Sequence, residues 1–242
     1  MVTMAPAARQ RAASRTDDDV EVIVARPDLG PDAVSASARL LSDGERERAR
    51  RFAFDRDRNR FIVVRALLRQ LLAARLGVPP EAVELASGTR GKPVLAGRFA
   101  ASNLRFNVSH CEDVVVYAFS SGREVGVDVE AVRTLSDADD VAARWFSPRE
   151  YARYRALEPG DRPLGFFQCW TRKEAFIKAL GEGLYHPLDR FDVSLAPGEP
   201  AEILRVDDVP GDRCGWHLRG FSPVPGFVAA VVTERLIEDD CS

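Results

Sequence analysis

The sequence predicts an α+β protein made of two similar halves. Two blocks of the chain, 42–77 and 147–181, each run from a serine through a short polar helix and a longer helix to a Leu-Gly stop. In each longer helix apolar residues recur at i, i+3, i+4 and i+7, and the closing glycine suits a left-handed C-cap. Short runs rich in β-branched and aromatic residues follow both blocks. The repeated order predicts two α+β halves related by an approximate two-fold, the alternative being chance recurrence of a common pattern.

The first segment, residues 1–18, is rich in Ala, Arg and Ser and has no apolar run that it could bury. It is therefore predicted to be a disordered tail, and it lacks the apolar centre of a secretory signal. The N-terminal half is expected over 19–121 and the C-terminal half over 122–242. A site between the halves would then draw on both.

The longer helices are expected over 61–76 and 166–180, and a short helix over 150–157. The strands are expected as echoing pairs, namely 105–109 with 190–194, 114–120 with 216–222, and 125–130 with 227–232.

Composition narrows the class of protein. The chain has 242 residues, is 45% hydrophobic and 29% charged, and has a formal net charge of −3. It can build a real core, shows no global basicity that would indicate nucleic acid, and has no apolar run near the roughly 18 residues of a membrane span. The four cysteines form no CxxC pair. This pattern disfavours zinc and disulfides and is typical of a cytoplasmic protein.

Two acidic side chains share one face of a predicted strand. In the stretch GVDVE, 126–130, side chains alternate between faces, so Asp128 and Glu130 point the same way, about 7 Å apart. Acids on an exposed strand face can serve solubility alone. Close like charges otherwise indicate a cation between them.

The helical stretch 170–184 adds a third carboxylate. Glu174 and Lys178 are i,i+4 neighbours, and taken alone they could be an ordinary surface pair. Taken together, Asp128, Glu130 and Glu174 would form an oxygen-only site for Mg²⁺, which prefers a few carboxylates with waters and phosphate oxygens.

Three other stretches suit a phosphate-rich ligand. Residues 90–93 form a turn whose glycine permits close approach to the backbone. Residues 107–110 end a strand with polar side chains, and the run 46–61 is dense in arginine, although most of these arginines could be solvated. The candidate ligand contacts are Arg48, Arg60, Arg90, Gly91, Lys92, Pro93, Ser109 and His110.

Lysine is rare in this chain. Only Lys92, Lys173 and Lys178 occur among the 34 lysines and arginines, and all three fall in these stretches. Lysine is a compact point charge that suits phosphate oxygens. Lys173 could, however, simply be solvated.

At these residues a family resemblance appears. The order FNVSH, GVDVE and WTRKEAFIKALGEGL resembles the 4′-phosphopantetheinyl transferases in their long, monomeric form, which modifies carrier proteins of polyketide and nonribosomal peptide biosynthesis. The resemblance covers roughly residues 40–235. It implies a pseudo-dimeric α+β fold with coenzyme A between the halves and Mg²⁺ on its pyrophosphate.

By this resemblance the site residues take specific roles. The metal positions match Asp128, Glu130 and Glu174, and the lysine on the phosphates matches Lys178. The turn that holds the coenzyme matches Arg90 and Lys92, and the contacts to the 3′-phosphate match Ser109, His110 and Arg48.

One departure concerns the N-terminal basic helix. Family members can carry two lysines there, and the earlier position is Glu45 in this chain. The candidates for the 3′-phosphate contact are therefore Arg46, Arg48, Arg50 and Arg60.

The resemblance implies that a serine of an apo carrier protein attacks the β-phosphorus of coenzyme A and that adenosine 3′,5′-bisphosphate leaves. Glu174 is the expected general base, directly or through a water, and Lys178 the group that stabilises the leaving phosphate. Two alternatives are another Mg²⁺-dependent phosphodiesterase or nucleotidyl transferase, and a non-enzymatic coenzyme A-binding domain.

Overall fold

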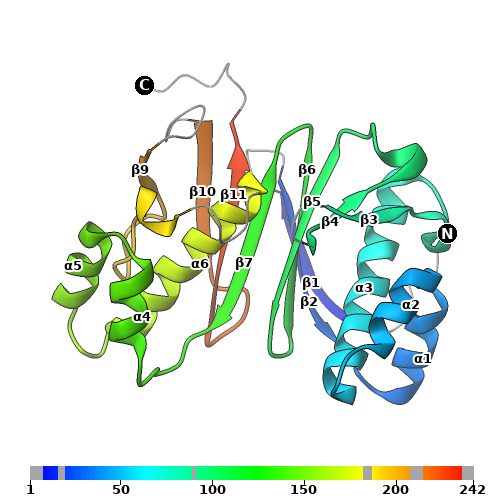
Figure 1. Ribbon diagram of the computed structural model, residues 1–242, viewed down its shortest axis with the longest axis horizontal. Helices are drawn as coiled ribbons and strands as arrows, with labels where there is room; N and C mark the ends of the chain where they lie inside the picture. The colour runs from blue at the N-terminus through cyan, green and yellow to red at the C-terminus, as the bar shows by residue number, and fades with distance from the viewer. Residues whose placement is uncertain (1–7, 16–19, 89–90, 182–186, 208–214, 236–242) are drawn as a thin grey trace.

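The computed structural model describes residues 8–15, 20–88, 91–181, 187–207 and 215–235. It confirms the predicted α+β class. Figure 1 shows two sheets side by side in the middle of the molecule, with helices α1–α3 on one side and α4–α6 on the other. No helix among the described residues is long and apolar enough to cross a membrane.

Within its described residues, the first half contains α-helices and strands. The helices are α1 (Pro31–Arg39), α2 (Asp43–Arg50) and α3 (Asp55–Leu76). Its strands are β1 (Ala8–Arg15), β2 (Glu21–Pro27), β3 (Leu85–Ser87), β4 (Pro93–Leu95), β5 (Leu104–Cys111) and β6 (Val114–Ser121).

The second half repeats this arrangement. Its helices are α4 (Ala138–Trp145), α5 (Pro148–Ala156) and α6 (Arg162–Leu180). Its strands are β7 (Val125–Ala131), β8 (Phe191–Val193), β9 (Ile203–Val206), β10 (Trp216–Phe221) and β11 (Phe227–Glu234).

Strand order reveals the internal two-fold. The first sheet is ordered β1-β2-β6-β5 and the second β10-β11-β7. In the first half, the last strand, β6, pairs with both β2 and β5. In the second half, the last strand, β11, pairs with both β7 and β10. Hence β2, β6 and β5 correspond to β7, β11 and β10. The echoing pairs expected from sequence were wrong, because equivalence depends on pairing between distant segments and not on local likeness.

The N-terminal tail was predicted to be disordered, and this is wrong for residues 8–15. Strand β1 pairs antiparallel with β2, from Ala8 opposite Pro27 to Arg15 opposite Glu21. An open sheet edge offers unpaired backbone groups, so a polar segment can join it without apolar side chains. Residues 1–7 and 16–18 lie outside the described residues, and the division of the chain at 121/122 stays a prediction.

The same capping device starts the second helix of each half. Ser42 and Glu45 form a reciprocal capping box on α2, and Ser147 and Glu150 form one on α5. Each capping glutamate also binds a buried cation from the following long helix: Arg69 Nε lies 2.7 Å from Glu45, and Lys173 Nζ lies 2.7 Å from Glu150. Lys173 is therefore buried rather than solvated.

A shared apolar core joins the halves. Val114, Val116 and Ala118 of β6 pack in one cluster with the valines of β7, Val125, Val127 and Val129. These side chains are at most 1% exposed. The polar side chains of β7 therefore face away from this core, toward helix α6 and strand β5.

Candidate active site

Strands β5 and β7 meet edge to edge, although they belong to different sheets. The buried Asn107 Oδ1 accepts a hydrogen bond from Val127 N at 3.0 Å, and Ser109 Oγ donates to Asp128 Oδ1 at 2.8 Å. The side chains of β5 thus replace a backbone ladder and place the first half directly beside Asp128.

Helix α6 brings a lysine to the same aspartate. Lys178 Nζ donates to Asp128 Oδ1 at 2.6 Å and to Ser109 Oγ at 3.2 Å. The helix can come this close because of Gly126: a Cβ there would lie 2.0 Å from the Ala175 carbonyl oxygen. The glycine of GVDVE is therefore needed for helix–strand contact.

The predicted carboxylates line a single cavity of about 400 Å³. Its walls come from β5, β7 and α6 and consist of Val108, Ser109, His110, Asp128, Val129, Glu130, Trp170, Glu174 and Lys178. Asp128 is only 5% exposed, so it is not a solubilising surface acid. Nor are Glu174 and Lys178 a simple surface pair, because the lysine binds Asp128 across the helix–strand contact.

The cavity is strongly acidic. Burial raises the pKa of Glu174 to about 7; Lys178 opposes this shift, while Asp128 and Glu130 add to it. Burial also raises the pKa of Glu130, and the negative charge of Asp128 raises it further. Crowded carboxylates of this kind favour either protons or a bound cation.

The donor set fits a hard divalent cation. Asp128 Oδ2 is buried and has no hydrogen-bond partner, so one oxygen is free for a ligand. Carboxylate oxygens are what Mg²⁺ prefers. Within the described ranges, however, no three acidic, His or Cys side chains stand together at metal-binding geometry. The carboxylate oxygens of Asp128, Glu130 and Glu174 are therefore ligands of the type that Mg²⁺ prefers, but the three side chains do not stand at metal-binding geometry in this structure.

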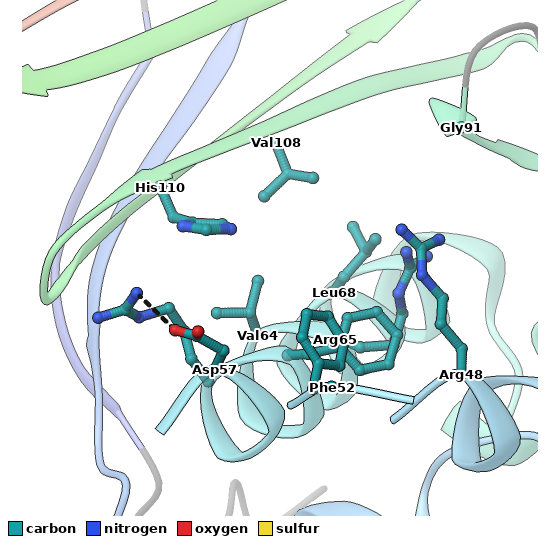
Figure 2. Close-up of a pocket in the computed structure, with 11 residues that line it drawn as sticks. Arg48, Phe52, Asp57, Val64, Arg65, Leu68, Gly91, Val108 and His110 are labelled. Carbon is teal, nitrogen blue, oxygen red and sulfur yellow. Dashed lines mark ion pairs between the residues drawn. The ribbon is translucent and has the colours of Figure 1, made fainter. Parts of the chain in front are cut away.

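A second cavity of about 350 Å³ adjoins the first and shares Val108 and His110 with it. Figure 2 shows His110 and Val108 on one wall, facing Phe52, Arg48 and Arg65 across the space. Partial burial lowers the pKa of His110, and the positive charges of Arg60 and Lys178 lower it further. This basic cavity suits phosphate groups.

The structure separates the four arginine candidates. Arg48 and Arg60 line the basic cavity. Arg46 instead binds Asp43 and the Leu41 carbonyl oxygen within its own helix region, and Arg50 pairs with Glu47. Of these four, only Arg48 and Arg60 are placed to meet a ligand in that cavity.

Sequence reasoning missed Arg65, which also lines the basic cavity. Its guanidinium lies 5.6 Å from the centre of the Phe61 ring, and that of Arg48 lies 5.3 Å from the same ring. Burial lowers the pKa of Arg65, and Glu45 opposes this shift. A lone arginine in the otherwise apolar stretch FIVVRALL was the available signal.

The described residues of the predicted turn, 91–93, line two different cavities. Gly91 lines the basic cavity, whereas Lys92 and Pro93 line a third cavity of about 360 Å³. Lys92 Nζ donates to the main-chain carbonyl oxygen of Lys178 at 2.8 Å. The Lys92 ammonium therefore lies against the main chain of α6 and does not line the basic cavity. Arg90 lies outside the described residues.

A basic cavity that adjoins one lined by three carboxylates is a suitable place for a polyanionic ligand beside a hard cation. Comparisons with known proteins give the family. A profile described as 4′-phosphopantetheinyl transferase, N-terminal, matches residues 30–122, and one described as 4′-phosphopantetheinyl transferase superfamily matches residues 124–232. The chain belongs to the 4′-phosphopantetheinyl transferase family.

Two curated relatives carry the name of this family. The chain is 40% identical to the 4′-phosphopantetheinyl transferase HetI of Nostoc sp., covering 78% of this chain and 83% of that protein. It is 28% identical to the 4′-phosphopantetheinyl transferase Sfp of Bacillus subtilis, covering 79% and 81%. Among solved structures, the holo-[acyl-carrier-protein] synthase of Thermotoga maritima aligns with a TM-score of 0.35 and 24% identity, over 46% of this chain and 62% of that one.

Proposed function

We propose that this protein transfers the 4′-phosphopantetheine arm of coenzyme A to a serine of apo acyl or peptidyl carrier proteins and releases adenosine 3′,5′-bisphosphate. One observation carries the assignment of the site: Asp128, Glu130, Glu174 and Lys178 line one cavity that adjoins a basic one. Family membership supports the reaction, and neither a general phosphodiesterase nor a non-enzymatic domain has support among the relatives.

The order of chemical groups along the two cavities matches the order of groups in coenzyme A. Arg48, Arg60 and His110 would hold the 3′-phosphate in the basic cavity. Ser109 was expected at the 3′-phosphate, but it lines the acidic cavity and is hydrogen-bonded to Asp128 and Lys178. The pyrophosphate would then lie beside Ser109 and Lys178 in that cavity. Arginine, histidine and lysine side chains donate strong charge-assisted hydrogen bonds to phosphate oxygens.

Asp128, Glu130 and Glu174 would hold Mg²⁺. When bound, Mg²⁺ neutralises charge on the pyrophosphate so that a nucleophile can approach. The free Oδ2 of Asp128 and the mutual repulsion of the three carboxylates support this assignment.

Two side chains would act on the reacting groups. Glu174 accepts the proton of the incoming serine hydroxyl, directly or through a water. Lys178 donates hydrogen bonds to the phosphate as negative charge builds up on it. Losing such a donor typically costs about 10²–10³ in rate.

Further features support a monomer that acts in the cytoplasm. Both halves of the site come from one chain, with Ser109 from the first and Asp128 from the second, so a monomer suffices. Cys111 and Cys169 are free thiols, as expected for a protein of the cytoplasm. We assign carrier domains of polyketide and nonribosomal peptide biosynthesis as its partners on the strength of the sequence resemblance.

The test is direct. The protein is incubated with coenzyme A, Mg²⁺ and a purified apo carrier domain, and the carrier is weighed by mass spectrometry. We expect the carrier to gain one phosphopantetheine group, and EDTA to stop the gain until Mg²⁺ is restored. Release of adenosine bisphosphate without a carrier would instead indicate hydrolysis, and turnover unaffected by EDTA would refute the metal assignment.

A further inference from the structure

Lys92 ties the two halves together at the end of helix α6. Its ammonium group donates to the carbonyl oxygen of Lys178 at 2.8 Å and lies 3.5 Å from the carbonyl oxygen of Val125. The carboxylate of Glu124 lies 3.8 Å from the same ammonium. A side chain of the first half therefore reaches both the helix and the strand that carry the acidic cavity.

The contacted carbonyl belongs to the last turn of α6, which ends at Leu180 and is followed by Gly181 in the left-handed conformation. Carbonyl oxygens in a last turn lack partners inside the helix and carry the negative end of its dipole. A lysine ammonium there stabilises the turn and fixes its position. Lys178 extends toward Asp128 from this same turn.

We propose that Lys92 is a positioning residue that acts through Lys178. Its ammonium holds the last turn of α6 so that the Lys178 ammonium stays between Asp128 and the bound phosphates. The neighbouring Gly91 lines the basic cavity, so the turn that borders the coenzyme also sets the position of Lys178. This inference rests on the proposed role of Lys178, and it differs from a direct contact between the Lys92 ammonium and coenzyme A.

Lys92→Met removes the ammonium and keeps most of the side-chain length. We expect kcat for transfer to a purified apo carrier domain to fall about tenfold, the effect of losing one charged hydrogen bond. The Kd for coenzyme A, measured by calorimetry, should stay within about twofold. Lys92→Arg should recover most of kcat, because a guanidinium can also donate to a helix carbonyl. A raised Kd with normal kcat would overturn the proposal, because the ammonium would then be a coenzyme contact.

Arg105→Met is the matched control. Arg105 Nε binds the same Glu124 carboxylate at 3.0 Å, and its other described contact is the Ser102 carbonyl oxygen rather than α6. The Arg105→Met variant should leave kcat and the Kd for coenzyme A unchanged. An equal loss in Arg105→Met would show that the charge network around Glu124, and not the α6 contact, sets the rate.

A double-mutant cycle separates this inference from the proposed function. In a Lys178→Met background, adding Lys92→Met should cause no further loss, because its effect passes through the missing ammonium. A full additional loss would overturn the inference. Normal kcat in Lys178→Met alone would instead refute the role of Lys178. If Lys92→Met does not fold, Lys92→Gln, which is too short to reach the helix, gives the same division between kcat and Kd.

Discussion

Lys173 of helix α6 and Glu150 of helix α5 form a fully buried ion pair. Lys173 Nζ lies 2.7 Å from Glu150 Oε2, and both side chains are 1% exposed. The same ammonium donates to the Phe191 carbonyl oxygen at 2.7 Å, and Glu150 Oε1 accepts from Val193 N at 2.8 Å. The pair therefore fastens α5 and β8 to α6, next in sequence to Glu174.

The first prediction contrasts two lysines of one helix. Lys173→Met leaves the Glu150 carboxylate buried and unpaired, which typically costs about 3–5 kcal/mol. We expect a large drop in melting temperature with nearly normal turnover per folded molecule at low temperature. Lys178→Met should lose turnover and show a smaller drop in melting temperature, because Lys178 is partly exposed and Asp128 keeps its hydrogen bond from Ser109. Thermal melts and transfer assays on both variants check this, and a catalytic defect in folded Lys173→Met would contradict a purely structural role.

The second prediction concerns Asp128. Because this carboxylate is buried and hydrogen-bonded to Lys178 and Ser109, Asp128→Asn is the informative change: it keeps an acceptor oxygen and removes the charge. We expect kcat to fall about 10²-fold or more, and the dependence of turnover on Mg²⁺ concentration to weaken. Turnover is measured across a Mg²⁺ titration. Asp140→Asn, at an exposed position of α4, is the control and should behave as the unchanged protein.

Local sequence signals predicted some parts of the fold and missed others. The long helices and their glycine ends were predictable because caps and apolar periodicity are local signals. That Asp128, Glu130 and Glu174 line one cavity was expected from the family resemblance of their two motifs, because the strand and helix patterns alone do not say that these elements pack together. The predicted pairing of strands failed, since pairing joins segments far apart in sequence.

Side-chain destinations were harder to predict than elements. A lysine has a long flexible stem, so its position in a motif does not say where its ammonium goes. Lys92 was expected at the coenzyme and binds helix α6. Lys173, which the sequence pattern allowed to be solvated, is buried. In the first half, Glu45 looked like a missing basic contact, but it caps α2 together with Ser42 and forms an ion pair with Arg69.

The third prediction tests the close contact between α6 and β7. In Gly126→Ala the new methyl group would lie 2.0 Å from the Ala175 carbonyl oxygen and 2.4 Å from Ala179 N, so the helix must move away. We expect a stability loss of about 1–3 kcal/mol or more and a fall in kcat as Lys178 shifts from Asp128. Chemical unfolding and transfer assays measure both. Gly44→Ala, in α2 with open space around it, should instead be neutral or slightly stabilising.

The fourth prediction concerns acid stability. Burial alone would raise the pKa of Asp192, but hydrogen bonds from Arg205 and Ser147 outweigh it and lower that pKa below its usual value. Because the folded-state pKa is depressed, the ionised carboxylate contributes stability above the unfolded-state pKa of about 3.9, and this stability is lost as the pH falls through the folded-state value. Asp192→Asn should therefore be less stable at neutral pH and lose less stability on acidification. Urea unfolding over a pH series tests this, and parallel curves for both proteins would count against it.

The last prediction concerns Glu174 and Lys178, which line one cavity from successive turns of α6. If the two side chains had a structural role alone, Glu174→Gln and Lys178→Met would change the stability of the fold and leave the rate alone. As a metal ligand and base, Glu174 should lose most of kcat when its charge and basicity are removed. Lys178→Met keeps the apolar stem but removes a donor to the phosphates, so kcat/KM should fall about 10²-fold or more. The two losses should not add, because both side chains act on one transition state.

The measurement is a double-mutant cycle on transfer to an apo carrier domain with melts run in parallel. Two active single variants with slightly lowered melting temperatures would return this helix face to a structural role and remove the proposed mechanism.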